Sequence, residues 1–148
     1  MQISEILTPD RIQCKVECSS KKDALDIIAK SIAGGNYSLS QNEIFNCLLA
    51  RERLGSTALG HGIAIPHGRL KHGSTTMTAF LQLKKGIDYD AIDQQPVDLL
   101  FALIVPEQST DEHLQILSRL AEMFSDKKLV DQIRRTSNTG SIYELLTS

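Results

Sequence analysis

The chain has 148 residues, of which 41% are hydrophobic and 23% are charged, a composition typical of a globular domain with one buried core. Its length predicts a single domain over residues 1–148. The net charge of -2 argues against nucleic-acid binding, because phosphate backbones select basic surfaces. No apolar run approaches the roughly 20 residues that a membrane span requires, and residues 1–7 show no leader pattern. We therefore expect a cytoplasmic protein that is not membrane-embedded and keeps its cysteines reduced.

The first third of the chain predicts one strand and two helices. Residues 11–18 alternate between apolar and polar side chains, which is the pattern of a half-buried strand. Ser20 is suited to cap a helix whose apolar residues recur at helical spacing up to Gly34. Ser40 precedes a second helix, which we expect to close near Gly55 with basic residues in its last turn.

The second half of the chain continues the alternation of strands and helices. Residues 75–83 predict a strand, and residues 84–86 predict a turn after it. Residues 97–105 form a near-continuous apolar run, which is typical of a strand covered on both faces. Residues 109–112 open a helix, and two shorter helices close the chain. Because strands and helices interleave, we expect an α/β fold with helices on both faces of a sheet.

Residues 55–69 carry the features that suggest chemistry. Glycines punctuate this segment, and such stretches need unusual backbone dihedrals or a close approach of other atoms. The segment lacks the Gly-Lys-Ser/Thr ending of a P-loop. Residues 63–65 predict a short strand that Pro66 ends, while Gly68 leaves the backbone free on the other side. His67 is thus held at a strand end, where the sites of α/β proteins tend to lie.

An imidazole in this place can act as a nucleophile, because with an ordinary pKa of about 6.5 it is mostly neutral at cytosolic pH. Covalent phosphohistidine fits this chemistry if hydrogen-bond donors meet the phosphoryl charge. His113 is the second candidate histidine, since it lies in the first turn of a predicted helix, whose positive end favours a neutral ring that can donate one N–H. The other candidate donors to phosphate are the side chains of Arg51, Ser56, Thr57 and Arg69.

These residues also allow plainer interpretations. A lone histidine in a loop is usually a surface residue, and Arg51 is also consistent with a solvated helix end. A metal hydrolase is a further alternative, although no His-x3-His on a helix and no nearby acidic pattern supports it, and we expect no metal. From the residues alone we predict an α/β domain with a histidine-centred anion site. The histidines of the metal alternative are His61, His67, His72 and His113.

Three stretches of the chain resemble one known family. They are residues 51–57 (Arg-Glu-Arg-Leu-Gly-Ser-Thr), residues 62–69 (Gly-Ile-Ala-Ile-Pro-His-Gly-Arg) and residues 90–106. Residues 20–25 are similar too, so the likeness spans essentially the whole chain. The chain resembles the enzyme IIA component of the nitrogen-related phosphotransferase system, within the broader fructose/mannitol-type EIIA family. The resemblance implies one EIIA type 2 domain with a mixed sheet of about five strands flanked by helices.

The resemblance also implies roles for individual residues. It implies that His67 accepts a phosphoryl group from the phosphohistidine of an HPr-like carrier, with His113 as the second active-site histidine. Arg51 and Thr57 are implied to line the pocket. We expect in-line transfer between two histidines, without metal or cofactor. We expect the docking surface to be an apolar ring around the phosphorylated histidine that includes Leu54, Leu59 and Ile63.

Nitrogen-type members of the family act chiefly as regulators, which bind targets such as potassium transporters and sensor kinases according to their phosphorylation state. The resemblance therefore implies a phosphorylation-dependent regulator of nitrogen, potassium or carbon metabolism, rather than an enzyme that turns over a small molecule. Two alternatives stay open. In one, the chain passes the phosphoryl group to a IIB domain in fructose- or mannitol-type sugar uptake. In the other, it is a purely binding module in which phosphorylation of His67 is vestigial.

Overall fold

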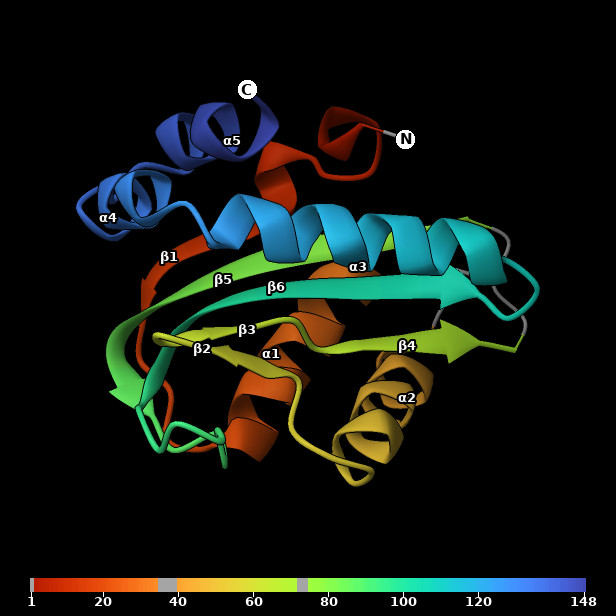
Figure 1. Cartoon of the computed structure of the whole chain (residues 1–148). Helices are drawn as coiled ribbons and strands as arrows, with labels where there is room; N and C mark the ends of the chain where they lie inside the picture. The colour runs from red at the N-terminus through yellow and green to blue at the C-terminus, as the bar shows by residue number, and fades with distance from the viewer. Residues whose placement is uncertain (1, 35–39, 72–74) are drawn as a thin grey trace.

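A six-stranded mixed sheet forms the centre of the protein, and helices cover both of its faces (Figure 1). The computed structural model describes residues 2–34, 40–71 and 75–148. The strands are β1 (Ile12–Val16), β2 (Ala58–Gly60), β3 (Ile63–Ala64), β4 (His67–Leu70), β5 (Met77–Ile87) and β6 (Val97–Pro106). The helices are α1 (Lys21–Ala33), α2 (Gln41–Glu52), α3 (Thr110–Phe124), α4 (Lys127–Arg134) and α5 (Thr139–Thr147), after 3-10 turns at Ile3–Glu5 and Pro9–Arg11. The expected α/β class and mixed sheet are confirmed.

Two of the helix starts that the sequence predicts are observed as ends capped by a serine side chain. The Ser20 hydroxyl accepts a hydrogen bond from the Asp23 N–H at 3.1 Å, which opens α1. The Ser40 hydroxyl accepts one from the Glu43 N–H at 3.2 Å, which opens α2. Each bond satisfies a donor that the first helical turn would leave unpaired. Within the described residues α2 ends at Glu52, slightly before the predicted end near Gly55.

One local prediction was wrong, namely the turn at residues 84–86. Strand β5 continues through these residues to Ile87, which pairs with Val97 after an irregularity in the register. Gly86 has a different purpose there, because a Cβ at this position would lie 2.7 Å from the Pro96 Cβ. The glycine therefore allows the chain to pass close to the start of β6. Sequence alone does not separate this use from a turn.

Strand β6 divides the protein into two hydrophobic cores. Leu100 belongs to the core under α1 and α2, whereas Phe101 belongs to the core under α3, α4 and α5, and both are fully buried. In the second core the ring of Phe124 lies 6.1 Å from that of Phe101 and 6.5 Å from that of Phe80. Burial on both faces explains the near-continuous apolar run of β6. No helix in the described part of the chain is long and apolar enough to cross a membrane.

Strands β3 and β4 follow one another along the same edge of β6 and run parallel to it. Ile63 pairs with Leu99 in β3, and His67 pairs with Leu103 in β4, so the offset along β6 is the same in both strands. Between them the Pro66 carbonyl accepts a hydrogen bond from the Leu103 N–H at 2.9 Å. The chain thus crosses Pro66 without losing register. Because the residues of β6 that pair with β3 and β4 are buried, this pairing fixes the position of His67.

The side chains of β4 alternate between the two faces of the sheet. Gly68 and Leu70 are buried on the α2 side, whereas His67 and Arg69 face the α3 side. Gly68 does not have a positive φ, so the expected backbone freedom is not its purpose. A Cβ on Gly68 would instead lie 2.5 Å from the Cys47 Sγ and 3.3 Å from the Cys47 carbonyl oxygen. Glycine therefore lets α2 pack directly against the strand that carries His67.

This close approach predicts the effect of a single added methyl group. We expect Gly68→Ala to lower the free energy of unfolding by about 1–3 kcal/mol, because the new Cβ overlaps Cys47 in a packed layer. Urea unfolding followed by circular dichroism measures the change. In a Cys47→Ala background, which lacks the Sγ atom, the same substitution should cost less. Equal costs in the two backgrounds would show that the contact does not limit this position.

Candidate functional site

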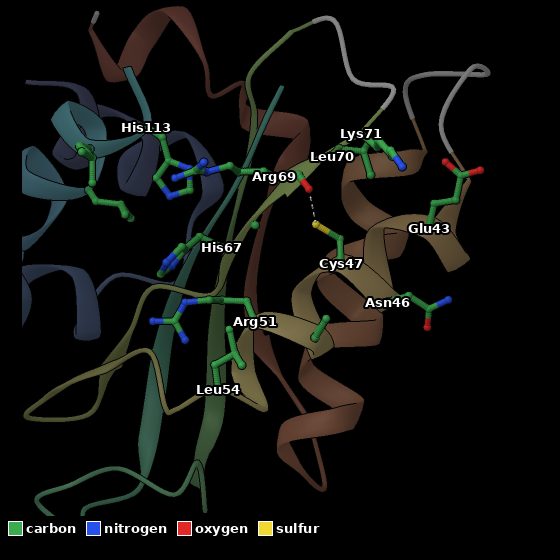
Figure 2. A pocket seen from close by; sticks show the side chains of 14 residues that line it. Glu43, Asn46, Cys47, Arg51, Leu54, His67, Arg69, Leu70, Lys71 and His113 are labelled. Carbon is green, nitrogen blue, oxygen red and sulfur yellow. Dashed lines mark hydrogen bonds between the residues drawn. The ribbon is translucent and has the colours of Figure 1, made fainter. Parts of the chain in front are cut away.

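An open cleft of about 780 Å³ lies between α2, β4 and the first turns of α3 (Figure 2). His67 and His113 both line it, and their ring centroids are 5.3 Å apart with an interplanar angle of 81°. These two histidines are far apart in the sequence, and the parallel pairing of β4 with β6 brings them together. The cleft is thus centred on the pair of histidines that the sequence singles out.

The ring of His67 is held in one tautomer by its own backbone. Its Nδ1 atom lies 2.6 Å from the carbonyl oxygen of Ile65. A carbonyl oxygen only accepts hydrogen bonds, so Nδ1 carries the proton and donates it. In the neutral ring the lone pair then resides on Nε2. His67 is half-buried, and the ring is directed into the cleft, so Nε2 is the nucleophilic atom that the site offers.

The surroundings of His67 favour its neutral form. Burial is the main cause that lowers the pKa of His67, and the positive charge of Arg51 lowers this pKa further. The hydrogen bond to Ile65 and the negative charge of Glu52 act in the opposite direction, but the net pKa is lowered from its ordinary value. A lowered pKa leaves the ring unprotonated near pH 7. The lone pair on Nε2 is therefore available for covalent chemistry.

His113 is more deeply placed, with only 5% of its surface exposed. Burial, followed by the charges of His67, Arg69 and Arg51, lowers the pKa of His113 to about 4. Its Nδ1 atom is buried and makes no hydrogen bond to the described residues. An unpaired buried acceptor costs less than an unpaired donor, which favours the tautomer with the proton on Nε2. A neutral ring of this kind can donate one hydrogen bond to an anion bound beside it.

Two arginines bring positive charge to the cleft from opposite sides. Arg51, in the last turn of α2, extends toward His67, and Arg69 of β4 lies beside His113 (Figure 2). The Nη1 atom of Arg51 donates a hydrogen bond to the Gly55 carbonyl at 2.9 Å, which leaves its other N–H groups for a ligand. Neither arginine has an ion pair to the described residues. The cleft is therefore built to receive an anion.

Ser56 and Thr57, the other predicted donors, are placed outside the cleft. The Ser56 hydroxyl donates to the Tyr89 carbonyl at 3.2 Å and accepts a hydrogen bond from the Ala58 N–H at 3.2 Å. Thr57 is 6% exposed, and its hydroxyl donates to the carboxylate of Glu52. Both hydroxyls are thus engaged by the protein itself, and the structure does not bring them to the anion.

The three leucine and isoleucine residues expected around His67 have different surroundings. Leu54 lines the cleft and is 84% exposed, whereas Leu59 is 45% exposed but does not line it. Ile63 is buried, so the structure does not bring it to the surface. Leu114, which the sequence analysis did not single out, is 58% exposed at the rim of the cleft. Its place directly after His113 was the available signal for this role.

Of the two other histidines, His61 does not line the cleft. His61 is exposed, and its backbone N–H donates to the Asp93 carboxylate at 2.9 Å. His72 lies outside the described residues. Over residues 2–34, 40–71 and 75–148, no group of three or more histidine, cysteine or acidic side chains is placed to hold a metal ion. The geometry of the cleft, with two neutral histidines and two arginines, is instead that of an anion-binding site with a nucleophile.

Known proteins have similar sequences and the same fold. Residues 5–148 match the family described as phosphoenolpyruvate-dependent sugar phosphotransferase system, EIIA 2. The chain is 42% identical to the nitrogen regulatory protein of Klebsiella oxytoca, over 99% of this chain and 91% of that protein. The structure matches nitrogen regulatory protein IIA-Ntr of Neisseria meningitidis with a TM-score of 0.93 and 40% identity, over 98% and 99% of the two chains. IIA mannitol of Escherichia coli shares the fold, with a TM-score of 0.81 and 23% identity over 95% and 98%.

The chain therefore belongs to the EIIA type 2 family of the phosphotransferase system. Within this family it is similar over essentially its whole length to the nitrogen regulatory proteins of the IIA-Ntr type. The resemblance seen in the sequence motifs is confirmed.

The lowered histidine pKa values predict how stability depends on pH. The pKa of His113 falls from its ordinary 6.5 to about 4, so between these values the unfolded chain binds more protons than the native protein. We therefore expect the free energy of unfolding to decrease as the pH falls from 6.5 toward 4. Urea unfolding at a series of pH values measures this slope. His113→Gln, which does not titrate, should show a shallower slope, and an unchanged slope would contradict the assignment.

Proposed function

We propose that His67 accepts a phosphoryl group on its Nε2 atom from the phosphohistidine of an HPr-like carrier protein. The observation that carries this proposal is the hydrogen bond from His67 Nδ1 to the Ile65 carbonyl, which leaves Nε2 as the free nucleophile in the cleft. The membership in a phosphoenolpyruvate-dependent phosphotransferase family supports a phosphohistidine donor. The lowered pKa of His67 supports attack by a neutral ring near pH 7.

The transfer is a displacement at phosphorus between two nitrogen atoms. The lone pair of His67 Nε2 forms the new N–P bond while the N–P bond of the carrier breaks and its electron pair returns to the carrier's ring. Nδ1 keeps its proton throughout, since the Ile65 carbonyl holds it. Little covalent chemistry is required of the protein, so positioning and electrostatic stabilisation account for most of the rate.

The charges of the cleft suit the phosphoryl group. Arg51 and Arg69 supply fixed positive charge and N–H donors to its oxygens, and His113 supplies one more donor without adding charge. A phosphoryl group brings a charge of about -2 into the cleft. This charge lies beside the exposed side chains of Leu54 and Leu114. A partner that contacts these leucines therefore also lies next to the phosphoryl charge, and its affinity depends on whether His67 is phosphorylated.

This arrangement supports a regulatory role, as the names of the nitrogen regulatory relatives suggest. We infer that the protein acts in the cytoplasm and binds regulatory targets, such as potassium transporters or sensor kinases, with an affinity that depends on the state of His67. Pull-downs with the wild type, His67→Ala and the charge mimic His67→Asp compare these affinities. Equal capture of phosphorylated and unmodified protein would instead favour a purely binding module.

Phosphorylation itself gives the first test. With phosphoenolpyruvate, enzyme I and an HPr-like carrier, we expect the wild type to gain a phosphoryl group that is stable in alkali, because phosphohistidine is base-stable. His67→Ala should gain none, and His61→Ala should be labelled like the wild type. Nitrogen-15 NMR of the labelled protein should place phosphorus on Nε2. Labelling that survives in His67→Ala, or phosphorus on Nδ1, would contradict the proposal.

The apolar rim of the cleft predicts a docking effect with a matched control. Leu54 and Leu114 flank the cleft, whereas Ile92 is even more exposed, at 94%, and does not line it. We expect Leu54→Asp and Leu114→Asp to slow phosphoryl transfer from the carrier on the order of tenfold or more, since truncating a central apolar contact costs above 1 kcal/mol. Ile92→Asp should transfer at the wild-type rate. Stopped transfer reactions at several carrier concentrations measure these rates.

A further inference from the structure

Glu52 is a buried carboxylate immediately beside the site, and the mechanism above does not use it. Its side chain is 2% exposed, although it lies at the end of α2 next to Arg51. Burying a carboxylate is costly unless hydrogen bonds and an opposite charge compensate it. The burial of Glu52 therefore calls for a structural or functional explanation, and the contacts of its carboxylate indicate one.

The contacts of Glu52 close the loop that follows α2. The Thr57 N–H donates to both carboxylate oxygens, at 2.8 Å and 3.2 Å, and the Thr57 hydroxyl donates to the same carboxylate. The Lys21 Nζ lies 3.4 Å from the other side of the carboxylate and 4.6 Å from the centre of the Tyr89 ring. Lys21 neutralises the charge of Glu52, while Thr57 ties residue 57 back to the end of the helix. The base of loop 53–56 is thus fixed inside the protein.

The closed loop in turn holds Arg51. Within the loop the Gly55 carbonyl accepts a hydrogen bond from Arg51 Nη1 at 2.9 Å. Figure 2 shows the guanidinium of Arg51 next to the ring of His67. A guanidinium has five N–H donors in a rigid plane, so one bond to Gly55 sets the direction of the others. The same loop carries Leu54, which is more exposed than Leu114 at the cleft rim.

We infer that Glu52 is a positioning residue for phosphoryl transfer: through Thr57 it fixes the loop whose Gly55 carbonyl aims Arg51 at the phosphoryl group on His67. This role rests on the proposed function. It also gives Glu52 a second effect, because its negative charge raises the pKa of His67 and opposes Arg51. Glu52 therefore acts both on the direction of the donor and on the charge of the site.

Substitutions at both ends of the contact test the inference. We expect Thr57→Val, which removes the hydroxyl but keeps the N–H, to slow transfer to His67 on the order of tenfold to a hundredfold, as misplacing a catalytic group does. Thr57→Ser, which keeps the hydroxyl, should restore most of the rate. Glu52→Gln should slow transfer and also lower the pKa of His67, measured by NMR titration of its ring. Glu144→Gln, which removes an exposed charge on α5, is the control and should change neither quantity.

Combination with Arg51→Ala separates positioning from a general loss of structure. Because Glu52 and Thr57 are inferred to act through Arg51, Thr57→Val should cause little further loss of rate in the Arg51→Ala protein. The inference would be overturned if the rate losses of Thr57→Val and Arg51→Ala multiply in the double variant. Wild-type transfer rates in both Thr57→Val and Glu52→Gln would overturn it as well. If Glu52→Gln does not fold, the comparison of Thr57→Val with Thr57→Ser still tests the inference. A wild type that the carrier cannot label would overturn the proposed function and this role together, whereas a labelled wild type with unaffected variants overturns this role alone.

Discussion

The bond between the His67 ring and the Ile65 carbonyl is the constraint on which the site depends. It joins residues two apart across Pro66, and it exists because β3 and β4 keep one register along β6. Proline has no N–H, yet its carbonyl remains paired with β6, so the ring is held by a strand that cannot shift. One backbone carbonyl thus fixes the tautomer of the ring, and the tautomer determines which ring nitrogen has the free lone pair. Among the described residues, no other side chain forms a hydrogen bond with Nδ1.

The charges around this bond suit the binding of an anion. Burial and the charge of Arg51 lower the pKa of both histidines, and Arg69 lowers the pKa of His113 further, so the two rings stay neutral beside the two arginines. Glu52, the nearby acid, is neutralised by Lys21 on the far side and does not pair with Arg51 or Arg69. The arginines thus keep their donors for a ligand, at the cost of some repulsion between like charges. In the proposed transfer, the negative charge of the phosphoryl group relieves that repulsion.

Sequence reasoning succeeded where the information is local. Ser20 and Ser40 cap helices because a hydroxyl needs only its neighbours to reach a free N–H, and the apolar run of β6 follows from burial on both faces. It failed where the role of a residue depends on a contact with a segment distant in the sequence. Gly86 was predicted to lie in a turn and Gly68 to leave the backbone free, but the two glycines instead allow close approaches to Pro96 and Cys47. Nothing within several residues of either glycine reveals the atom that would clash with a Cβ.

By itself the sequence determined the class of fold and the order of the elements, and it predicted His67, within residues 55–69, as the central residue of the site. It also supplied both histidines and both arginines of the cleft. Only the tertiary structure decided which nitrogen is free, that Leu114 lies on the rim, and that the Thr57 hydroxyl serves Glu52 rather than the ligand. The physical reason is that burial and hydrogen-bond geometry depend on pairs of segments far apart in the chain. A given side chain can form hydrogen bonds or contacts with several kinds of partner, and the packed fold determines which of them lies within reach.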